Sequence, residues 1–165
     1  MFQLPFPVHD VNASSGSKDL GDLPEWDLSD LYSSQDAPEL SRDLQWLDQE
    51  CASFAADYEG QLAHLDAEEM LNCVLRNERI NTIAGRIMSF AGLRYYQLTV
   101  DGDRTKFMSD MQEKITDFTT PLVFFTLELN RIDDAALQAL LNANDALARY
   151  QPVFDRIRAM KPYQL

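Results

Sequence analysis

Apolar side chains recur in steps of three and four residues along most of the chain, the spacing of one face of a helix. The repeats predict helices over residues 36–60, 66–99 and 103–130, a fourth starting at Asp133, and a last one over residues 147–160. No stretch alternates apolar and polar residues with the period of a strand. The sequence therefore predicts an all-α fold, a helical bundle of about five helices with an extended N-terminal strap.

The most apolar segment is residues 121–132, with the sequence PLVFFTLELNRI. Its apolar residues cover most of the circumference of a helix, and such a helix is usually enclosed by other elements. We therefore expect this segment to be the central helix of the bundle. It is too short to span a bilayer, which requires about 20 apolar residues. Pro121 removes a backbone hydrogen bond, so we expect a kink near residues 119–121.

Local signals predict where the helices begin and end. Asp36 followed by Pro38 is typical of a helix start, and Gly60 is typical of a helix end. Asp66 and Glu69 have the spacing of a capping box, which predicts a second start. The other expected boundaries are a turn at residues 101–103, a cap at Asp133, a break at residues 142–145, an interruption at Pro152 and an end at Pro162.

The long helix predicted over residues 66–99 has two features that bear on its packing. The polar patch at residues 76–79 could mark a bend. Gly85, Ser89 and Gly92 lie on one face of the helix. Small side chains there predict that another helix approaches this face closely.

The N-terminal residues lack helical periodicity. Residues 1–20 contain two prolines and a run of Asn, Ser and Gly, so we expect a disordered tail in which His9 is incidental. Residues 20–32 instead carry leucines and aromatic side chains among acidic ones, while Gly21 and Pro24 oppose a long helix. We expect residues 20–32 to form an extended strap anchored by Trp26.

Charge limits the classes of partner. The net charge is −13, which argues against nucleic-acid binding and against electrostatic binding to a membrane. Residues 1–60 carry a net charge of −11 and residues 61–165 one of −2. The acidic part could steer cationic peptides, but a solvated surface that maintains solubility is the simpler interpretation.

The length and the cysteine content limit the number of domains and the kinds of cysteine site. A chain of 165 residues is about one domain in size. Two cysteines, Cys51 and Cys73, are too few for a disulfide scaffold or a four-ligand zinc site, so we expect buried free thiols in a reducing cytoplasm. The N-terminus has no basic segment followed by an apolar one, and hence no recognisable signal peptide.

The sequence contains no recognisable catalytic constellation. There are two histidines and no His-Glu-x-x-His, so we expect no metal site in this chain, and His64 is expected to face solvent. No phosphate-binding loop or Gly-x-Ser-x-Gly elbow is present. The three consecutive residues Arg94, Tyr95 and Tyr96 cannot all be buried on one helix face. They are the candidate substrate-binding residues, although a tyrosine packed within the bundle would also explain them.

Four segments, in order along the chain, resemble the N-terminal region of the oligoendopeptidase F family. They are residues 23–32 (LPEWDLSDLY), 85–91 (GRIMSFA), 122–133 (LVFFTLELNRID) and 161–165 (KPYQL). The likeness extends from about Leu20 to Leu165. The family comprises zinc metallopeptidases related to the thimet-type oligopeptidases.

The resemblance implies a cytoplasmic, all-helical enzyme that cleaves short oligopeptides inside a deep channel. In this family a His-Glu-x-x-His helix and a downstream glutamate hold zinc in the C-terminal part. Residues 21–165 would then be the N-terminal lobe, a wall or lid of the channel. The expected partners are the short oligopeptide substrate and the C-terminal catalytic domain. No catalytic or metal-binding residue is carried over, so we expect this chain to bind no zinc and to be inactive alone.

An alternative is a stand-alone helical module that binds a peptide or protein without enzymatic activity. Exposed apolar surface distinguishes the two interpretations. A lobe separated from its catalytic domain should expose an apolar patch, and a dimer through that patch is then possible. A self-sufficient module should be monodisperse with a polar surface.

Overall fold

The computed structural model describes residues 26–163, and every regular element in that range is helical. The all-α prediction is therefore confirmed. The α-helices are α1 (Pro38–Tyr58), α2 (Ala67–Gln97), α3 (Gly102–Thr119), α4 (Val123–Arg131), α5 (Asp134–Ala143), α6 (Asp145–Ala148) and α7 (Gln151–Arg158). The 3₁₀ turns are η1 (Leu62–His64), η2 (Thr120–Leu122) and η3 (Lys161–Tyr163).

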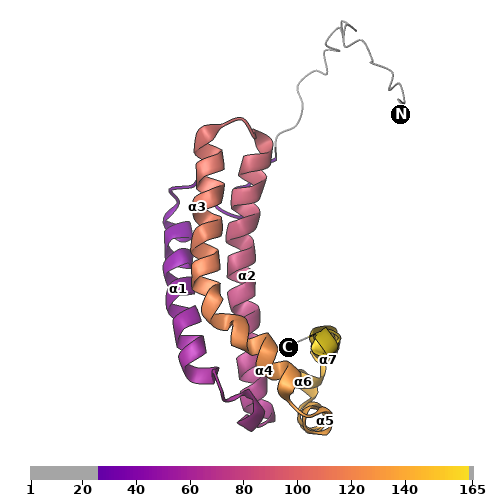
Figure 1. Cartoon of the computed structure of the whole chain (residues 1–165). Coiled ribbons are helices and arrows are strands. Elements are labelled where there is room, and N and C mark those ends of the chain that lie inside the picture. Colours follow the sequence, from indigo (N-terminus) through magenta and orange to yellow (C-terminus); the bar gives the residue numbers. More distant parts are fainter. Residues whose placement is uncertain (1–25, 164–165) are drawn as a thin grey trace, which may run out of the picture.

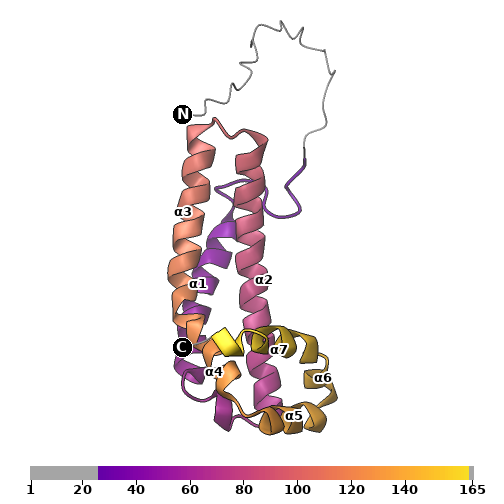
Figure 2. The same ribbon diagram turned by 45° about the vertical axis from the view of Figure 1, so that its right-hand side comes forward.

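Three long helices form the body of the molecule. Figure 1 shows α1, α2 and α3 side by side, with α2 and α3 joined at one end as an antiparallel hairpin. The four shorter helices gather at the opposite end, as Figure 2 also shows. With 31 residues α2 is about 46 Å long, so it contacts both α3 and the short helices.

Local capping signals position α2 and two other helices correctly. Asp66 accepts hydrogen bonds from the amides of Glu68 and Glu69, and the Glu69 carboxylate accepts one from the Asp66 amide, which confirms the capping box. Asp101 and Asp133 likewise cap α3 and α5. These bonds satisfy amides that a helix start leaves unpaired.

The expected Asp36 cap is wrong. Helix α1 starts with Ala37 as its cap residue and Pro38 at its first position, and no side chain bonds the first-turn amides. The Asp36 amide instead donates to Ser34 Oγ within the preceding turn. Proline supplies no amide at its own position, which reduces the need for a side-chain cap. Gly60 follows the helix with φ +80°, the left-handed conformation for which glycine is favoured.

The segment 121–132 is not the central helix. Helix α4 lies at the end of the long bundle (Figure 1) and buries Phe124, Phe125 and Leu129 while Val123 is 59% exposed. An apolar circumference indicates that a helix favours burial. It does not show how much of the helix surface the other elements of this domain cover. The element that links the two ends is α2.

The helix is interrupted where a kink was expected, near residues 119–121, whereas the role of Pro152 differs from the prediction. Helix α3 ends at Thr119, Pro121 lies in η2, and α4 follows. Pro152 does not interrupt a helix but lies in the first turn of α7, where a missing amide costs nothing. Asn144 caps the short α6, which explains the break predicted at residues 142–145.

Residues 76–79 do not mark a bend, because α2 continues unbroken through them. Arg76 donates to Glu50 and Asp57 of α1, each at 2.7 Å. The Arg79 guanidinium lies 4.6 Å from the centroid of the Trp46 ring. The polar patch therefore joins α2 to α1.

The small-residue face of α2 does not receive another helix. A Cβ atom added to Gly85 would meet no atom within 4 Å, and Ser89 is exposed. A Cβ atom on Gly92 would meet only the Tyr96 ring of the same helix, at 4.0 Å. The expectation of a close helix approach is therefore wrong for the described residues.

Tyr32, not Trp26, anchors the strap. Trp26 is 66% exposed, whereas Tyr32 is 2% exposed and its ring packs edge-on against Phe90. The Tyr32 hydroxyl donates to Asp43 at 2.6 Å, and Arg86 stacks on the Tyr32 ring at 4.4 Å. Burial, together with the bond to Asp43, raises the pKa of Tyr32. The predicted tail, His9 and the start of the strap lie outside the described residues.

Candidate functional site

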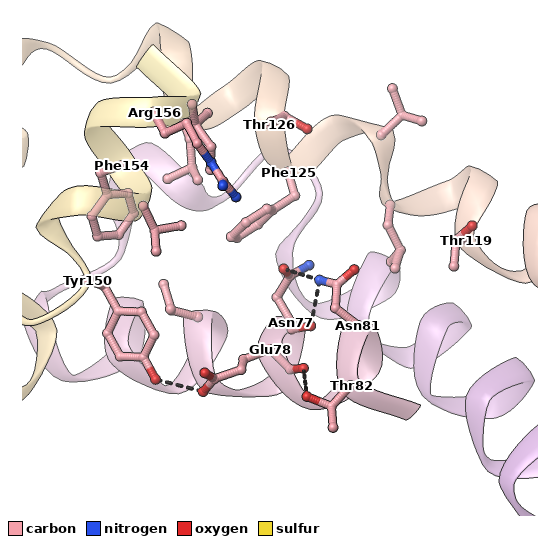
Figure 3. Close-up of a pocket in the computed structure, with 16 residues that line it drawn as sticks. Asn77, Glu78, Asn81, Thr82, Thr119, Phe125, Thr126, Tyr150, Phe154 and Arg156 are labelled. Carbon is pink, nitrogen blue, oxygen red and sulfur yellow. Dashed lines mark hydrogen bonds between the residues drawn. The ribbon is translucent and has the colours of Figure 1, made fainter. Parts of the chain in front are cut away.

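A cleft of about 710 Å³ lies between the first half of α2, the η2–α4 segment and α7 (Figure 3). Its residues come from three distant parts of the sequence, which the fold of the short helices brings together. Those from α2 are Val74, Asn77, Glu78, Asn81 and Thr82. The others are Thr119, Leu122, Val123, Phe125, Thr126, Leu129, Tyr150, Val153, Phe154, Arg156 and Ile157.

Apolar side chains line much of the cleft. Phe125 and Leu129 of α4, Phe154 of α7 and Val74 of α2 are buried. Val123 and Val153 remain 59% and 43% exposed. Helix α7 is held to α4 by Arg158, which donates to the carbonyl oxygens at the end of α4. The cleft therefore has a packed apolar base with further apolar side chains accessible to solvent.

Polar side chains of α2 line the opposite side and are largely paired with one another. The Asn81 amide donates to the side-chain and backbone oxygens of Asn77, at 2.8 and 2.9 Å. Tyr150 donates to the Glu78 carboxylate at 2.7 Å (Figure 3), and this bond raises the pKa of Tyr150. Thr82 bonds the Glu78 carbonyl oxygen. These bonds fix the α2 side of the cleft.

Arg156 is the one basic residue among those that line the cleft. It is exposed, and Figure 3 shows it extending from α7 toward the space between α4 and α2. It makes no ion pair or hydrogen bond with another residue in the range 26–163, and thus none with Glu78. Its charge is therefore available to a ligand.

The sequence-predicted candidates lie elsewhere, near the far end of α2. The Arg94 guanidinium lies 5.6 Å from the Phe90 ring centroid, and its Nε is buried without a partner among the described residues. Tyr95 is half-buried and Tyr96 is 71% exposed, with their ring centroids 5.3 Å apart. None of the three lines the cleft, and about 18 Å of helix separates Arg94 from Thr82. Their role in substrate binding stays a prediction.

The described residues contain no group of three or more potential metal ligands. His64 ends η1 and is exposed, as expected from its loop position. Asp101 and Asp133 accept capping bonds from first-turn amides, and the neighbouring Asp134 pairs with Arg158 and Lys161.

Both cysteines are free and buried, Cys51 in α1 and Cys73 in α2. Burial raises the pKa of Cys51 to about 11 and that of Cys73 to about 12. We expect neither thiol of the native chain to react with a disulfide reagent at about pH 8, because the reactive species is the thiolate. Both should react in concentrated guanidinium chloride, and rapid labelling of the native protein would contradict their burial.

No helix within the described part of the chain is long and apolar enough to cross a membrane. Searches of the curated proteins and of the solved structures gave no match. Residues 128–165, which are 38 of the 165, match the family model described as Oligopeptidase F, an N-terminal domain of M3 peptidases. The matched part runs from the second half of α4 through α7 and includes Arg156.

Two of the four sequence segments that suggested the resemblance lie wholly or partly in the matched part, namely residues 122–133 and 161–165. The segments at residues 23–32 and 85–91 lie outside it. The family match supports an N-terminal part of an oligopeptidase. Over residues 128–165, the chain is similar to the N-terminal domain of oligopeptidase F.

Proposed function

We propose that residues 21–165 are the N-terminal lobe of a zinc-dependent oligoendopeptidase that hydrolyses short peptides. In this proposal the lobe forms a wall or lid of the substrate channel and contributes confinement rather than chemistry. The observation that carries the proposal is the family match at residues 128–165. The helical architecture is consistent with it, because long rigid helices suit a wall.

The chemistry is assigned to a catalytic domain outside these 165 residues, with zinc activating a water molecule there. That domain and a short oligopeptide are the proposed partners, the parent is proposed to be cytoplasmic, and no nucleic-acid or membrane contact is proposed. The exposed apolar side chains Leu127, Met160 and Tyr163, none of which lines the cleft, offer a surface for the catalytic domain. A dimer of the isolated chain through the same side chains is the corresponding proposal for the lobe alone.

The purified 165-residue chain is expected to cleave no quenched fluorescent peptide, with or without added zinc. The reason is the absence of His-Glu-x-x-His from the sequence. The assay is followed by fluorescence over a range of chain concentrations, with an authentic zinc peptidase as positive control. Cleavage that depends on zinc and tracks the purified chain would overturn the assignment of the chemistry to another domain.

A further inference from the structure

We propose that the cleft between α2, α4 and α7 binds the C-terminal end of a short peptide, with Arg156 pairing with the terminal carboxylate. The ligand would carry an apolar side chain next to that carboxylate. The inference deepens the proposed function and rests on it for the choice of a peptide as the ligand. The site lies apart from Arg94, Tyr95 and Tyr96 and requires no metal.

The size and lining of the cleft fit a small ligand. At about 710 Å³ it falls within the range of roughly 300 to 1,000 Å³ typical of small-molecule sites. Such sites combine an apolar lining with a few polar groups that fix orientation. Phe125 and Phe154 provide aromatic surface here, and the exposed Val123 and Val153 extend the apolar contact.

Charge selects the chemistry of the ligand. Arg156 carries the one positive charge of the lining, on a chain whose net charge is −13. Its guanidinium has no acidic partner within 4 Å among the described residues, unlike those of Arg76 and Arg86. A guanidinium fork binds a carboxylate through two parallel hydrogen bonds. An unpaired arginine beside apolar surface therefore fits an apolar carboxylate.

The other polar groups are compatible with a carboxylate. Glu78, the one acid of the lining, comes from α2, opposite α7 (Figure 3). Its carboxylate accepts the Tyr150 hydroxyl, and no ion pair within 4 Å joins Glu78 to Arg156. Figure 3 shows the Asn77 amide pointing from α2 into the cleft. The amide nitrogen of Asn77 and the hydroxyl of Thr126 donate no hydrogen bond within residues 26–163, which leaves both available to ligand oxygens.

The test uses the full 165-residue chain and the tetrapeptide Ala-Ala-Leu-Phe in three forms. These are the free acid, the C-terminal amide and the N-acetylated acid. Isothermal titration calorimetry at low ionic strength should show the free acid binding at least about fivefold more tightly than the amide. Acetylation of the N-terminus should leave the affinity unchanged, because the proposal assigns no role to the ammonium group.

Two arginine variants complete the design. Arg156→Gln should abolish the preference for the acid over the amide while leaving the weaker apolar binding. Arg149→Gln removes an exposed arginine that does not line the cleft, so it should retain the preference. Thermal unfolding should be the same for both variants, because neither side chain bonds to another described residue.

Equal affinity for acid and amide, a preference that survives Arg156→Gln, or no binding at millimolar peptide would each overturn the proposal. None of these outcomes bears on whether a zinc-binding catalytic domain exists, because the assay involves no cleavage. Conversely, a preference for the acid that disappears in Arg156→Gln would stand even if the parent peptidase assignment failed.

Discussion

Replacing Phe54 with alanine is expected to destabilise the chain by about 3–5 kcal/mol, the usual cost of removing a fully buried phenylalanine. Phe54 is 0% exposed, and its ring lies 5.9 Å from those of both Phe124 and Phe125. It therefore joins α1 of the long bundle to α4 of the short helices. Arg76 also lies over this ring, at 5.7 Å.

Urea unfolding followed by circular dichroism measures this effect. Folded domains are stable by about 5–15 kcal/mol, so the variant should lose a large fraction of its stability. Its thermal midpoint should fall by about 10 °C. Val123→Ala is the matched control, because Val123 is 59% exposed on α4 and should change stability by less than about 0.5 kcal/mol. A cost below about 1 kcal/mol for Phe54→Ala would contradict the position of α4.

Replacing Tyr32 with alanine is expected to cost about 3 kcal/mol and to release the strap from the bundle. The side chain is 2% exposed and contacts Phe90, Asp43 and Arg86 together. Arg86 also donates to the Leu31 carbonyl oxygen, so the ring and the backbone are held by the same guanidinium. Loss of the ring removes the main apolar contact that fixes this arrangement.

Two further variants measure the contributions of the Tyr32 hydroxyl and of Trp26 to the stability. Tyr32→Phe keeps the ring and loses the bond to Asp43, at an expected cost of about 1 kcal/mol. Trp26→Ala should cost less than about 0.5 kcal/mol, because Trp26 is 66% exposed. Amide hydrogen exchange at Leu31 and Tyr32, whose amides bond the Leu28 carbonyl oxygen, reports release of the strap directly. A larger loss for Trp26→Ala than for Tyr32→Ala would restore Trp26 as the anchor.

The sequence predicted the helical fold and three helix starts because both depend on near neighbours. The spacing of apolar residues along a helix directly shows the helical period. Asp66, Asp101 and Asp133 accept hydrogen bonds from amides two or three residues away. The prediction failed at Asp36, where the competing signal was also local. The adjacent Pro38 starts the helix without a side-chain cap.

The position of α4 and the anchor of the strap were not predictable from near neighbours in the sequence. Apolar character alone does not distinguish a helix inside the bundle from one at its end. Trp26 and Tyr32 are both aromatic, and the choice between them depends on Asp43 and Arg86, which lie 11 and 54 residues from Tyr32.

The cleft could not be predicted because it has no sequence motif. Its lining combines residues 74–82, 119–129 and 150–157, which meet only when the short helices fold against α2. The sequence feature that points to the cleft is the set of polar residues Asn77, Glu78 and Asn81 close to the buried Val74. Arg156 gave no signal of its own, because an exposed arginine on a short amphipathic helix is ordinary.

The proposal that this chain is the N-terminal lobe of a zinc oligoendopeptidase is tested most directly by reading the coding sequence beyond Leu165. The account predicts an open frame that continues and encodes His-Glu-x-x-His. In that case the exposed surfaces of α4 and α7 are to be interpreted as channel wall and domain interface. A stop codon directly after Leu165 would contradict the account, and the chain would then be a helical binding module whose likeness to oligopeptidase F reflects ancestry alone.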